Sequence, residues 1–287
     1  MKIGVAGIGR MGAAIAERLL ATGETVYVWN RTAAKARALE ALGAQAVGTP
    51  GELTLAADVV LTILTDDEAI RATYLGEHGL LSVDARGKVF IEMSTARASV
   101  QRELAGEVRR RGARFAEAPV GGTVGPAREG KLIAFVGGGT DDFLSAKPVL
   151  DRLCRRIEHV GDVGAGAAMK LAANLPMHVY WTALREALVL CEPLDLDPAR
   201  LIDIMADTSG APQSLRARAA AIVQALRGED APAPAFDIDG IRKDLALMIE
   251  EAPAPLPVTR QALTCFDEAA RQGYGAESAA ALLRNRR

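Results

Sequence analysis

The sequence predicts two domains, an α/β domain built on a parallel sheet and then an all-α domain. Up to about residue 160, short β-rich runs alternate with alanine-rich helical stretches, and after residue 163 helical patterns continue without a β-branched run. Strands and helices that alternate at this spacing are typical of a parallel sheet with helices on both faces. We therefore expect the first domain to span residues 1–162 and the second to span residues 163–287.

The strands expected in the first domain are short apolar or β-branched runs, namely 2–6, 25–29, 59–64, 88–92, 114–118 and 132–136. Helical patterns fall between them, for example at 11–22, 33–42 and 99–111. Gly23 and Gly43 follow the first two of these helices, and glycine is common just after a helix ends.

The second domain is expected to be built from helices at 164–190, 198–205, 214–226, 238–251 and 257–272. Pro176 lies inside the first of them and should kink that helix or be absorbed locally. Proline-rich breaks at 231–236 and 252–257 separate the later helices. The long first helix carries apolar residues all round, and such a helix is usually buried on most sides. Because one thin domain would not cover it, we expect a homodimer or homotetramer.

Composition excludes several classes of partner. The formal net charge of −2 provides no basic field that would attract nucleic acid or a membrane surface. The chain has no apolar stretch of the ~18 residues that span a membrane, and its N-terminus lacks the apolar core of a signal peptide. No spacing typical of a disulfide framework or a metal site occurs among Cys154, Cys191, Cys265, His78, His159 and His178. We expect a cytoplasmic protein that binds no metal.

A glycine-rich loop directly follows the first expected strand and opens the first helix. Gly7 permits the tight turn, Gly9 lets the backbone approach a pyrophosphate, and Gly12 lets the helix and strand pack closely. In this context the pattern predicts a Rossmann-type nicotinamide dinucleotide site, with the pyrophosphate at the helix N-terminus. The residues expected to bind it are Gly7, Ile8, Gly9, Arg10, Met11 and Gly12.

The end of the second strand indicates which dinucleotide binds. A carboxylate there would repel a 2′-phosphate, whereas this chain has Asn30. Arg31 can grip a phosphate with two hydrogen bonds, Thr32 can donate a hydroxyl, and Lys35 lies one turn on. The pattern favours NADP over NAD. The alternative is that Arg31 and Lys35 are solvated surface charges.

Lys170 and Asn174 are the residues expected to carry the chemistry. They are four residues apart and thus share one helix face, among apolar neighbours that make unpaired polar groups costly to bury. A substrate carbonyl or hydroxyl would satisfy them, with Lys170 as general acid/base and Asn174 orienting the substrate. The alternative is a surface lysine. His178 follows on the same helix, and a packed histidine is its simpler interpretation.

The motifs together resemble the β-hydroxyacid dehydrogenase family, which includes 3-hydroxyisobutyrate dehydrogenases and glyoxylate/succinic semialdehyde reductases. They span nearly the whole chain in the right order: GIGRMG, EMSTA with Ser94 and Thr95, EAPVGGTVGPAREGKL at 117–132, GAGAAMKLAAN with Lys170 and Asn174, and RKDLAL with Lys243 and Asp244. The resemblance implies an NADPH-dependent oxidoreductase that interconverts a small aldehyde acid and its hydroxy acid.

The resemblance also assigns roles to residues outside the helix pair. It implies that Leu64, Thr65, Thr95 and Lys243 lie beside the cofactor, and that Ser94, Gly122 and Thr123 hold the substrate carboxylate. Gly121 and Asp244 are expected to belong to the same substrate site. The family's substrate loop usually reads serine, glycine, glycine. Here it reads glycine, glycine, threonine, so a hydroxyl is missing at Gly121 and gained at Thr123. The pocket is expected to be roomier than the family norm.

Three alternatives share parts of this pattern. A 6-phosphogluconate dehydrogenase would have a histidine where this chain has Ala173, and an imine reductase usually has aspartate or tyrosine in place of Lys170. A non-catalytic NADPH-binding module tends to lose the lysine. Lys170 together with Asn174 therefore favours the dehydrogenase.

Overall fold

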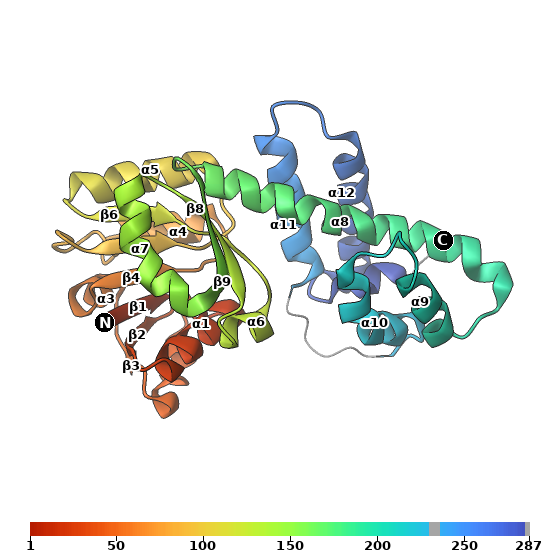
Figure 1. Ribbon diagram of the computed structural model, residues 1–287, viewed down its shortest axis with the longest axis horizontal. Helices are drawn as coiled ribbons and strands as arrows, with labels where there is room; N and C mark the ends of the chain where they lie inside the picture. Colours follow the sequence, from red (N-terminus) through yellow and green to blue (C-terminus); the bar gives the residue numbers. More distant parts are fainter. Residues whose placement is uncertain (230–235, 285–287) are drawn as a thin grey trace. The chain divides into compact units, whose positions relative to one another are not determined.

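The computed structural model describes residues 1–229 and 236–284, and it divides into two compact units (Figure 1). Unit 1 comprises Met1–Lys170 and unit 2 comprises Leu171–Arg287. The division falls within a single helix, α8 (Ala165–Cys191), a little after the boundary that the sequence suggests. Of the proline-rich break at 231–236, only Phe236 lies within the described residues.

In the described part of unit 1, the strands form one sheet in the order β3-β2-β1-β4-β5-β6-β8-β7, with β9 paired to β8. The strands from β3 to β6 run parallel, as expected. The strand order reverses at β1, and β4 lies on its other side, which places ligand sites of such sheets at the carboxyl ends of these strands. The bounds are β1 (Lys2–Ala6), β2 (Thr25–Trp29), β3 (Gln45–Ala46), β4 (Val59–Thr62), β5 (Val89–Glu92), β6 (Arg114–Glu117), β7 (Val120–Gly121), β8 (Leu132–Gly137) and β9 (Cys154–Gly161).

One end of this sheet differs from the expected parallel arrangement. β8 runs antiparallel to β6 and β7, and β9 then runs parallel to β8. The sequence analysis did not identify β9, because its charged residues give it no apolar run and much of it is exposed. Charged side chains are typical of such edge strands, since they discourage pairing with another chain. The sheet is therefore mostly parallel.

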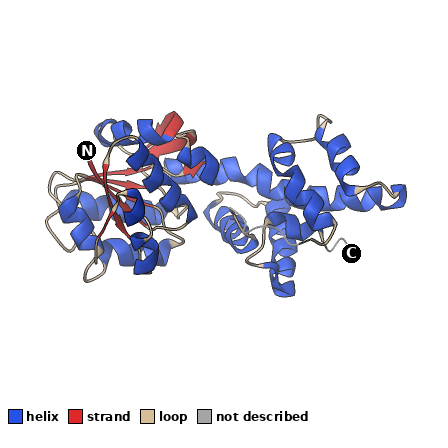
Figure 2. Ribbon diagram, turned by 90° about the horizontal axis from the view of Figure 1, so that it is seen from below, coloured by secondary structure: helices blue, strands red, loops and turns tan. Residues whose placement is uncertain are grey.

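Helices cover both faces of the sheet, and Figure 2 shows the strands lying between them. One buried cluster packs α1, α6 and α7 against the strands, and Ile15, Leu19 and Val149 contribute to it. The second cluster packs α3, α4 and α5, with Leu53, Tyr74 and Leu104 among its members. The bounds are α1 (Arg10–Ala21), α2 (Ala33–Arg37), α3 (Pro50–Ala56), α4 (Asp67–Leu75), α5 (Ala98–Arg110), α6 (Val124–Arg128) and α7 (Thr140–Leu153).

Local side chains explain where several of these helices begin and end. Asp66 caps α4 by accepting a hydrogen bond from the Ala69 N–H at 2.8 Å. The helix expected at 33–42 is interrupted, since α2 ends at Arg37 and a separate 3₁₀ turn covers Glu40–Leu42. Gly43 ends that turn in the left-handed conformation, with φ of 97°.

Unit 2 is helical in its described part, as the sequence predicts. Its elements are the later part of α8, then α9 (Pro198–Ala206), α10 (Gln213–Leu226), α11 (Ile238–Glu251) and α12 (Pro257–Ala269), with short turns after α8 and α12. Pro176 is absorbed within α8, which continues on both sides of it. Trp181, Leu245 and Phe266 are among the buried residues that form the core of this unit. No helix among the described residues is long and apolar enough to cross a membrane.

Candidate active site

The glycine loop has the geometry that a dinucleotide site requires. Gly7 has φ of 97°, and a Cβ atom there would lie 2.2 Å from the Ile63 carbonyl oxygen. A Cβ on Gly12 would lie 1.9 Å from the Gly7 carbonyl oxygen, so both positions must be glycine. A Cβ on Gly9 would meet nothing within 4 Å, and Gly9 is the N-cap of α1. The backbone is therefore open where a phosphate would approach the helix N-terminus.

Asn30 ties this loop to the end of β2. Its Oδ1 accepts a hydrogen bond from the Ile8 N–H at 3.0 Å, and its Nδ2 donates one to the Thr32 carbonyl at 3.0 Å. Asn30 therefore holds the backbone of the glycine loop and of the turn after β2 in place, and the Ile8 N–H already has a hydrogen-bond acceptor. The side chains of Arg31 and Lys35 are exposed, and within residues 1–229 and 236–284 neither has an ion-pair partner.

Ser94 and Leu64 lie together at the carboxyl ends of β4 and β5. The Ser94 hydroxyl oxygen accepts a hydrogen bond from the Leu64 N–H at 2.7 Å, and Ser94 is 2% exposed. Thr65, in contrast, is exposed, and Thr95 is half-buried. The structure thus joins one residue expected beside the substrate to one expected beside the cofactor.

A buried glutamate, Glu92, is hydrogen-bonded to the backbone of Ser94. The Glu92 carboxyl accepts hydrogen bonds from the Ser94 N–H at 2.7 Å and from the Thr62 hydroxyl, which is itself 3.0 Å from the Tyr74 hydroxyl. Burial is the main cause that raises the pKa of Glu92 to about 7, with a smaller contribution from Glu117, whereas hydrogen bonds from Ser94 and Thr62 lower it. Glu92 is therefore partly protonated near neutral pH.

The loop between β7 and α6, which the sequence analysis expects to bind the substrate, contains one obligatory glycine and one that is not. Gly122 has φ of 125°, and a Cβ there would lie 2.7 Å from Leu132 Cδ2. A Cβ on Gly121 would meet Phe135 and Ile133 only at 3.8 and 3.9 Å, which is ordinary contact. The backbone would thus accept a side chain at 121, so glycine there leaves space rather than relieving strain. Thr123 is exposed.

Lys170 lies half-buried on the second turn of α8, and Asn174 lies one turn further along the same helix. The first turn of α8 is anchored in unit 1, because Glu117 at the end of β6 accepts hydrogen bonds from the Gly164 N–H at 2.6 Å and the Gly166 N–H at 2.7 Å. Two of the sequence motifs, EAPV and GAGAAMK, are therefore in direct contact.

In unit 2, Asn174 belongs to a polar cluster with Lys243, Asp244 and His178. Asn174 Nδ2 donates to Asp244 Oδ2 at 3.2 Å, and Lys243 Nζ lies 3.3 Å from Asp244 Oδ1. Asp244 is 2% exposed. His178 is fully buried, stacks on the Phe236 ring and places Nε2 3.7 Å from Asp244 Oδ2. The packed interpretation of His178 holds, and Asp244 is the residue that orients the Asn174 amide.

Sequence reasoning missed Glu92 and Glu117, although each is the first residue of one of the sequence motifs. They are partners in register on β5 and β6, each at the last position of its strand, and both are fully buried. A carboxylate that ends an apolar strand, as in KVFIE and RFAE, is the signal that could have identified them, because buried charge needs a specific partner.

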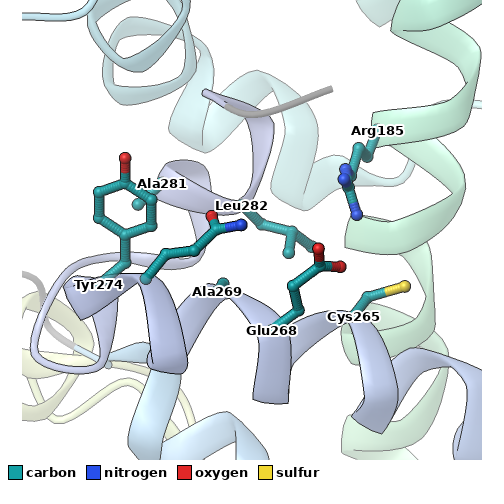
Figure 3. A pocket seen from close by; sticks show the side chains of 8 residues that line it. Arg185, Cys265, Glu268, Ala269, Tyr274, Ala281 and Leu282 are labelled. Atoms are coloured by element: carbon teal, nitrogen blue, oxygen red, sulfur yellow. The ribbon is translucent and has the colours of Figure 1, made fainter. Parts of the chain in front are cut away.

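Two pockets within unit 2 lie away from all of these residues. In one, Arg185 of α8 extends toward Glu268 and Cys265 of α12 (Figure 3), but a volume of about 10 Å³ accommodates roughly one water molecule. The other, between α9 and α10, has a volume of about 590 Å³ and is lined by residues such as Ile202, Arg216 and Val223. No group of three or more potential metal ligands occurs among the described residues.

Both units match known protein families. Residues 2–161 match the family described as the NAD binding domain of 6-phosphogluconate dehydrogenase. Residues 164–285 match the family described as NAD-binding of NADP-dependent 3-hydroxyisobutyrate dehydrogenase.

Individual relatives match over nearly the whole chain. The sequence is 32% identical to a 2-(hydroxymethyl)glutarate dehydrogenase of Eubacterium barkeri, over 99% of this chain and 94% of that protein. It is 31% identical to glyoxylate/succinic semialdehyde reductase 1 of Arabidopsis thaliana, over 96% of this chain and 94% of that protein. The solved structure of Psf3 in complex with NADP+ and 2-OPP superposes with a TM-score of 0.87 at 28% identity, over 98% of each chain.

Proposed function

The chain belongs to the β-hydroxyacid dehydrogenase family, and on that basis we propose that it interconverts a small aldehyde acid and its hydroxy acid with NADPH. The observation that carries the proposal is the Lys170–Asn174 pair on α8, whose amide is held by Asp244 at 3.2 Å. It occurs in a chain whose Gly7–Gly12 loop is open for a dinucleotide. An ammonium and an oriented amide suit a carbonyl oxygen on which charge develops.

The residues present fit NADPH. The Gly9 backbone and the N-terminus of α1 would hold the pyrophosphate, and Arg31 would grip the 2′-phosphate, since it is exposed and lacks an ion-pair partner among the described residues. The NADP+ bound by the similar Psf3 supports the same choice. When bound, this cofactor supplies or accepts the hydride.

Lys170 acts as the general acid/base. In reduction, its ammonium donates a proton to the carbonyl oxygen as the oxygen gains negative charge, and in oxidation its neutral amine removes the hydroxyl proton. Asn174 orients the same oxygen, and Asp244 keeps its amide from rotating. Lys243, beside Asp244, would close over the bound molecules.

The substrate is expected to carry a carboxylate. The exposed backbone of Gly122 and the Thr123 hydroxyl offer hydrogen-bond donors, and the Ser94 hydroxyl is expected to contribute another. The space left at Gly121 supports a substrate bulkier than the family norm. The branched dicarboxylate named for the Eubacterium barkeri relative is of that kind, whereas glyoxylate and succinic semialdehyde, named for the Arabidopsis relative, are smaller.

Replacing Lys170 tests the proposal. We expect Lys170→Ala to lower kcat by ~10²–10⁴, the usual contribution of a general acid/base, while NADPH binding stays near that of the wild type. Lys170→Arg should not restore activity, because a guanidinium does not release its proton at working pH. Lys147→Ala, which removes a half-buried lysine paired with Asp151 on α7, is the matched control. If Lys170→Ala keeps more than about a tenth of the activity, Lys170 is not the acid/base.

A substrate panel tests the chemistry itself. NADPH consumption is measured with glyoxylate, succinic semialdehyde, tartronate semialdehyde and methylmalonate semialdehyde, and NADP+ reduction with 2-(hydroxymethyl)glutarate. Cyclic imines and 6-phosphogluconate are the comparison compounds. Turnover of an imine with none of the aldehyde or hydroxy acids would contradict the proposed function.

A further inference from the structure

Glu117 occupies an unusual place between the sheet and α8. It is the last residue of β6, is fully buried, and uses one carboxylate oxygen, Oε1, to accept from the N–H groups of Gly164 and Gly166. The first N–H groups of a helix have no partner within the helix, and the helix dipole favours a negative charge there. The carboxylate is therefore the N-terminal anchor of a helix that starts at Ala165.

The surrounding backbone is built to admit this carboxylate. A Cβ atom on Gly137 of β8 would lie 2.0 Å from Glu117 Oε1. A Cβ on Gly166 would lie 3.0 Å from the same oxygen and 2.5 Å from the Phe135 carbonyl oxygen. Two glycines on different elements thus bring the backbone close enough for both hydrogen bonds, which fixes the position of this turn tightly.

Hydrogen-bond donors and one positive charge surround the buried Glu117 carboxyl. The pKa of Glu117 is raised, mainly by burial, and hydrogen bonds from the N–H groups of Gly164, Gly166 and Ala167, together with the charge of Arg102, oppose this rise. Glu92, its partner in register, is also buried, and burial raises its pKa to about 7. The N–H groups at the start of α8 therefore offset part of the cost of burying the Glu117 carboxyl.

Lys170 lies four residues after Gly166 and hence on the same face of α8. Helical side chains lean toward the N-terminus, so the Lys170 side chain leaves the helix over the turn that Glu117 holds. We propose that Glu117 is a positioning residue, whose carboxylate sets the place from which Lys170 reaches the reacting oxygen by anchoring the first turn of α8. The proposal rests on the acid/base role proposed for Lys170.

Kinetics of Glu117→Gln test the inference. The amide has nearly the same shape but lacks the charge, so the fold is retained while the anchor weakens. We expect kcat to fall by ~10- to 100-fold, with the KM for substrate and the Kd for NADPH changed little, because small displacements of a reacting group cost rate rather than binding. We expect the kcat of Glu117→Ala to be lower still.

Glu24→Gln is the matched control, since it also neutralises a buried carboxyl in unit 1. Glu24 pairs with the N-terminal amino group at 2.6 Å and with Arg152, away from α8. Its replacement should lower the thermal midpoint without lowering kcat. If Glu24→Gln and Glu117→Gln lower kcat alike, the effect is general destabilisation and the inference is wrong.

Amine labelling provides a readout that does not depend on activity. Wild type and Glu117→Gln are treated with acetic anhydride, and the acetylation of Lys170 relative to Lys147 is measured by mass spectrometry of peptides. We expect the ratio to change by about threefold or more, because a loosened first turn opens more often. An unchanged ratio together with an unchanged kcat overturns the inference. If Lys170→Ala proves active, the proposed function fails, and the labelling ratio alone decides whether Glu117 positions Lys170.

Discussion

At the scale of single residues, buried carboxyls and exposed cations are expected to have different roles. Glu92 and Glu117 are buried and act on the backbone of neighbouring segments, whereas Arg31 and Lys35 are exposed at the end of β2 and lack ion-pair partners in the described part of the chain. Buried groups are expected to affect folding and its pH dependence, while the exposed cations are expected to affect only ligand binding.

Arg31 is expected to carry most of the preference for NADPH. A charge-assisted contact with the 2′-phosphate is worth ~1.5–3 kcal/mol, so NADPH should be preferred over NADH by tenfold or more. Arg31→Ala should remove most of that preference, and Lys35→Ala should remove less because lysine cannot form the paired contact. Measuring kcat/KM with both cofactors checks this. Equal use of NADH by the wild type would refute the prediction.

Glu92 is expected to make stability depend on pH. Its pKa in the folded protein is raised from 4.5 to about 7, so its contribution to stability is fully present below pH 4.5 and is lost as pH rises toward 7. The loss amounts to up to about 1.4 kcal/mol per pH unit in that window. Glu92→Gln mimics the protonated form, since its amide can donate to the Thr62 hydroxyl while its oxygen accepts from the Ser94 N–H.

Thermal midpoints at about pH 5 and about pH 8 measure this difference. The variant should lose less stability than the wild type between these two pH values, and the difference between the two proteins isolates the contribution of Glu92. An identical pH dependence of the two proteins would show that Glu92 keeps an ordinary pKa.

At the scale of elements, the glycine loop and α8 show how backbone approach prepares a site. The loop brings the Gly7 carbonyl to within 1.9 Å of where a Cβ on Gly12 would be. At the start of α8, Gly166 together with Gly137 of β8 instead lets the Glu117 carboxylate reach the backbone. In both places glycine leaves space at a helix N-terminus. The space is open to a ligand at α1 and is filled by a carboxylate at α8, so glycine patterns indicate helix N-termini that bind negative groups.

Two alanine substitutions separate packing from ligand approach in this loop. Gly12→Ala should destabilise unit 1 by ~1–3 kcal/mol because the new methyl overlaps the Gly7 carbonyl. Gly9→Ala should leave stability unchanged, since its Cβ meets nothing within 4 Å, yet it should weaken NADPH binding by about tenfold or more by filling the space for the pyrophosphate. Thermal midpoints and NADPH titrations distinguish them. Normal NADPH affinity in Gly9→Ala would show that the pyrophosphate binds elsewhere.

At the scale of the whole molecule, each unit has its own core, and unit 2 exposes two apolar side chains near the end of α8. Leu190 near the end of α8 is 80% exposed and Leu194 just beyond it is 58% exposed. Exposed apolar residues close together are typical of surfaces that associate. They support the expectation of a homodimer or homotetramer built through this unit.

Leu190→Asp should shift the protein toward a monomer, because a charge at the centre of an apolar interface loses its hydration. Light scattering at micromolar concentration would then report the chain mass of 30.2 kDa for the variant and a multiple of it for the wild type. Leu144→Asp, at a position 56% exposed on α7 of unit 1, is the control and should leave the assembly intact. A wild-type monomer would rule out the predicted assembly.

The sequence alone determined what depends on local pattern. Apolar periodicity predicted β1 and β2 at their observed bounds and α11 likewise, and spacing placed Lys170 and Asn174 on one helix face. The tertiary structure decided what depends on segments far apart in the chain. It made β8 antiparallel, joined Glu117 to Gly164 and tied Asn174 to Asp244. The physical reason is that helices and strands follow from neighbours in sequence, whereas the partner of a buried polar group is whichever distant segment folding brings against it.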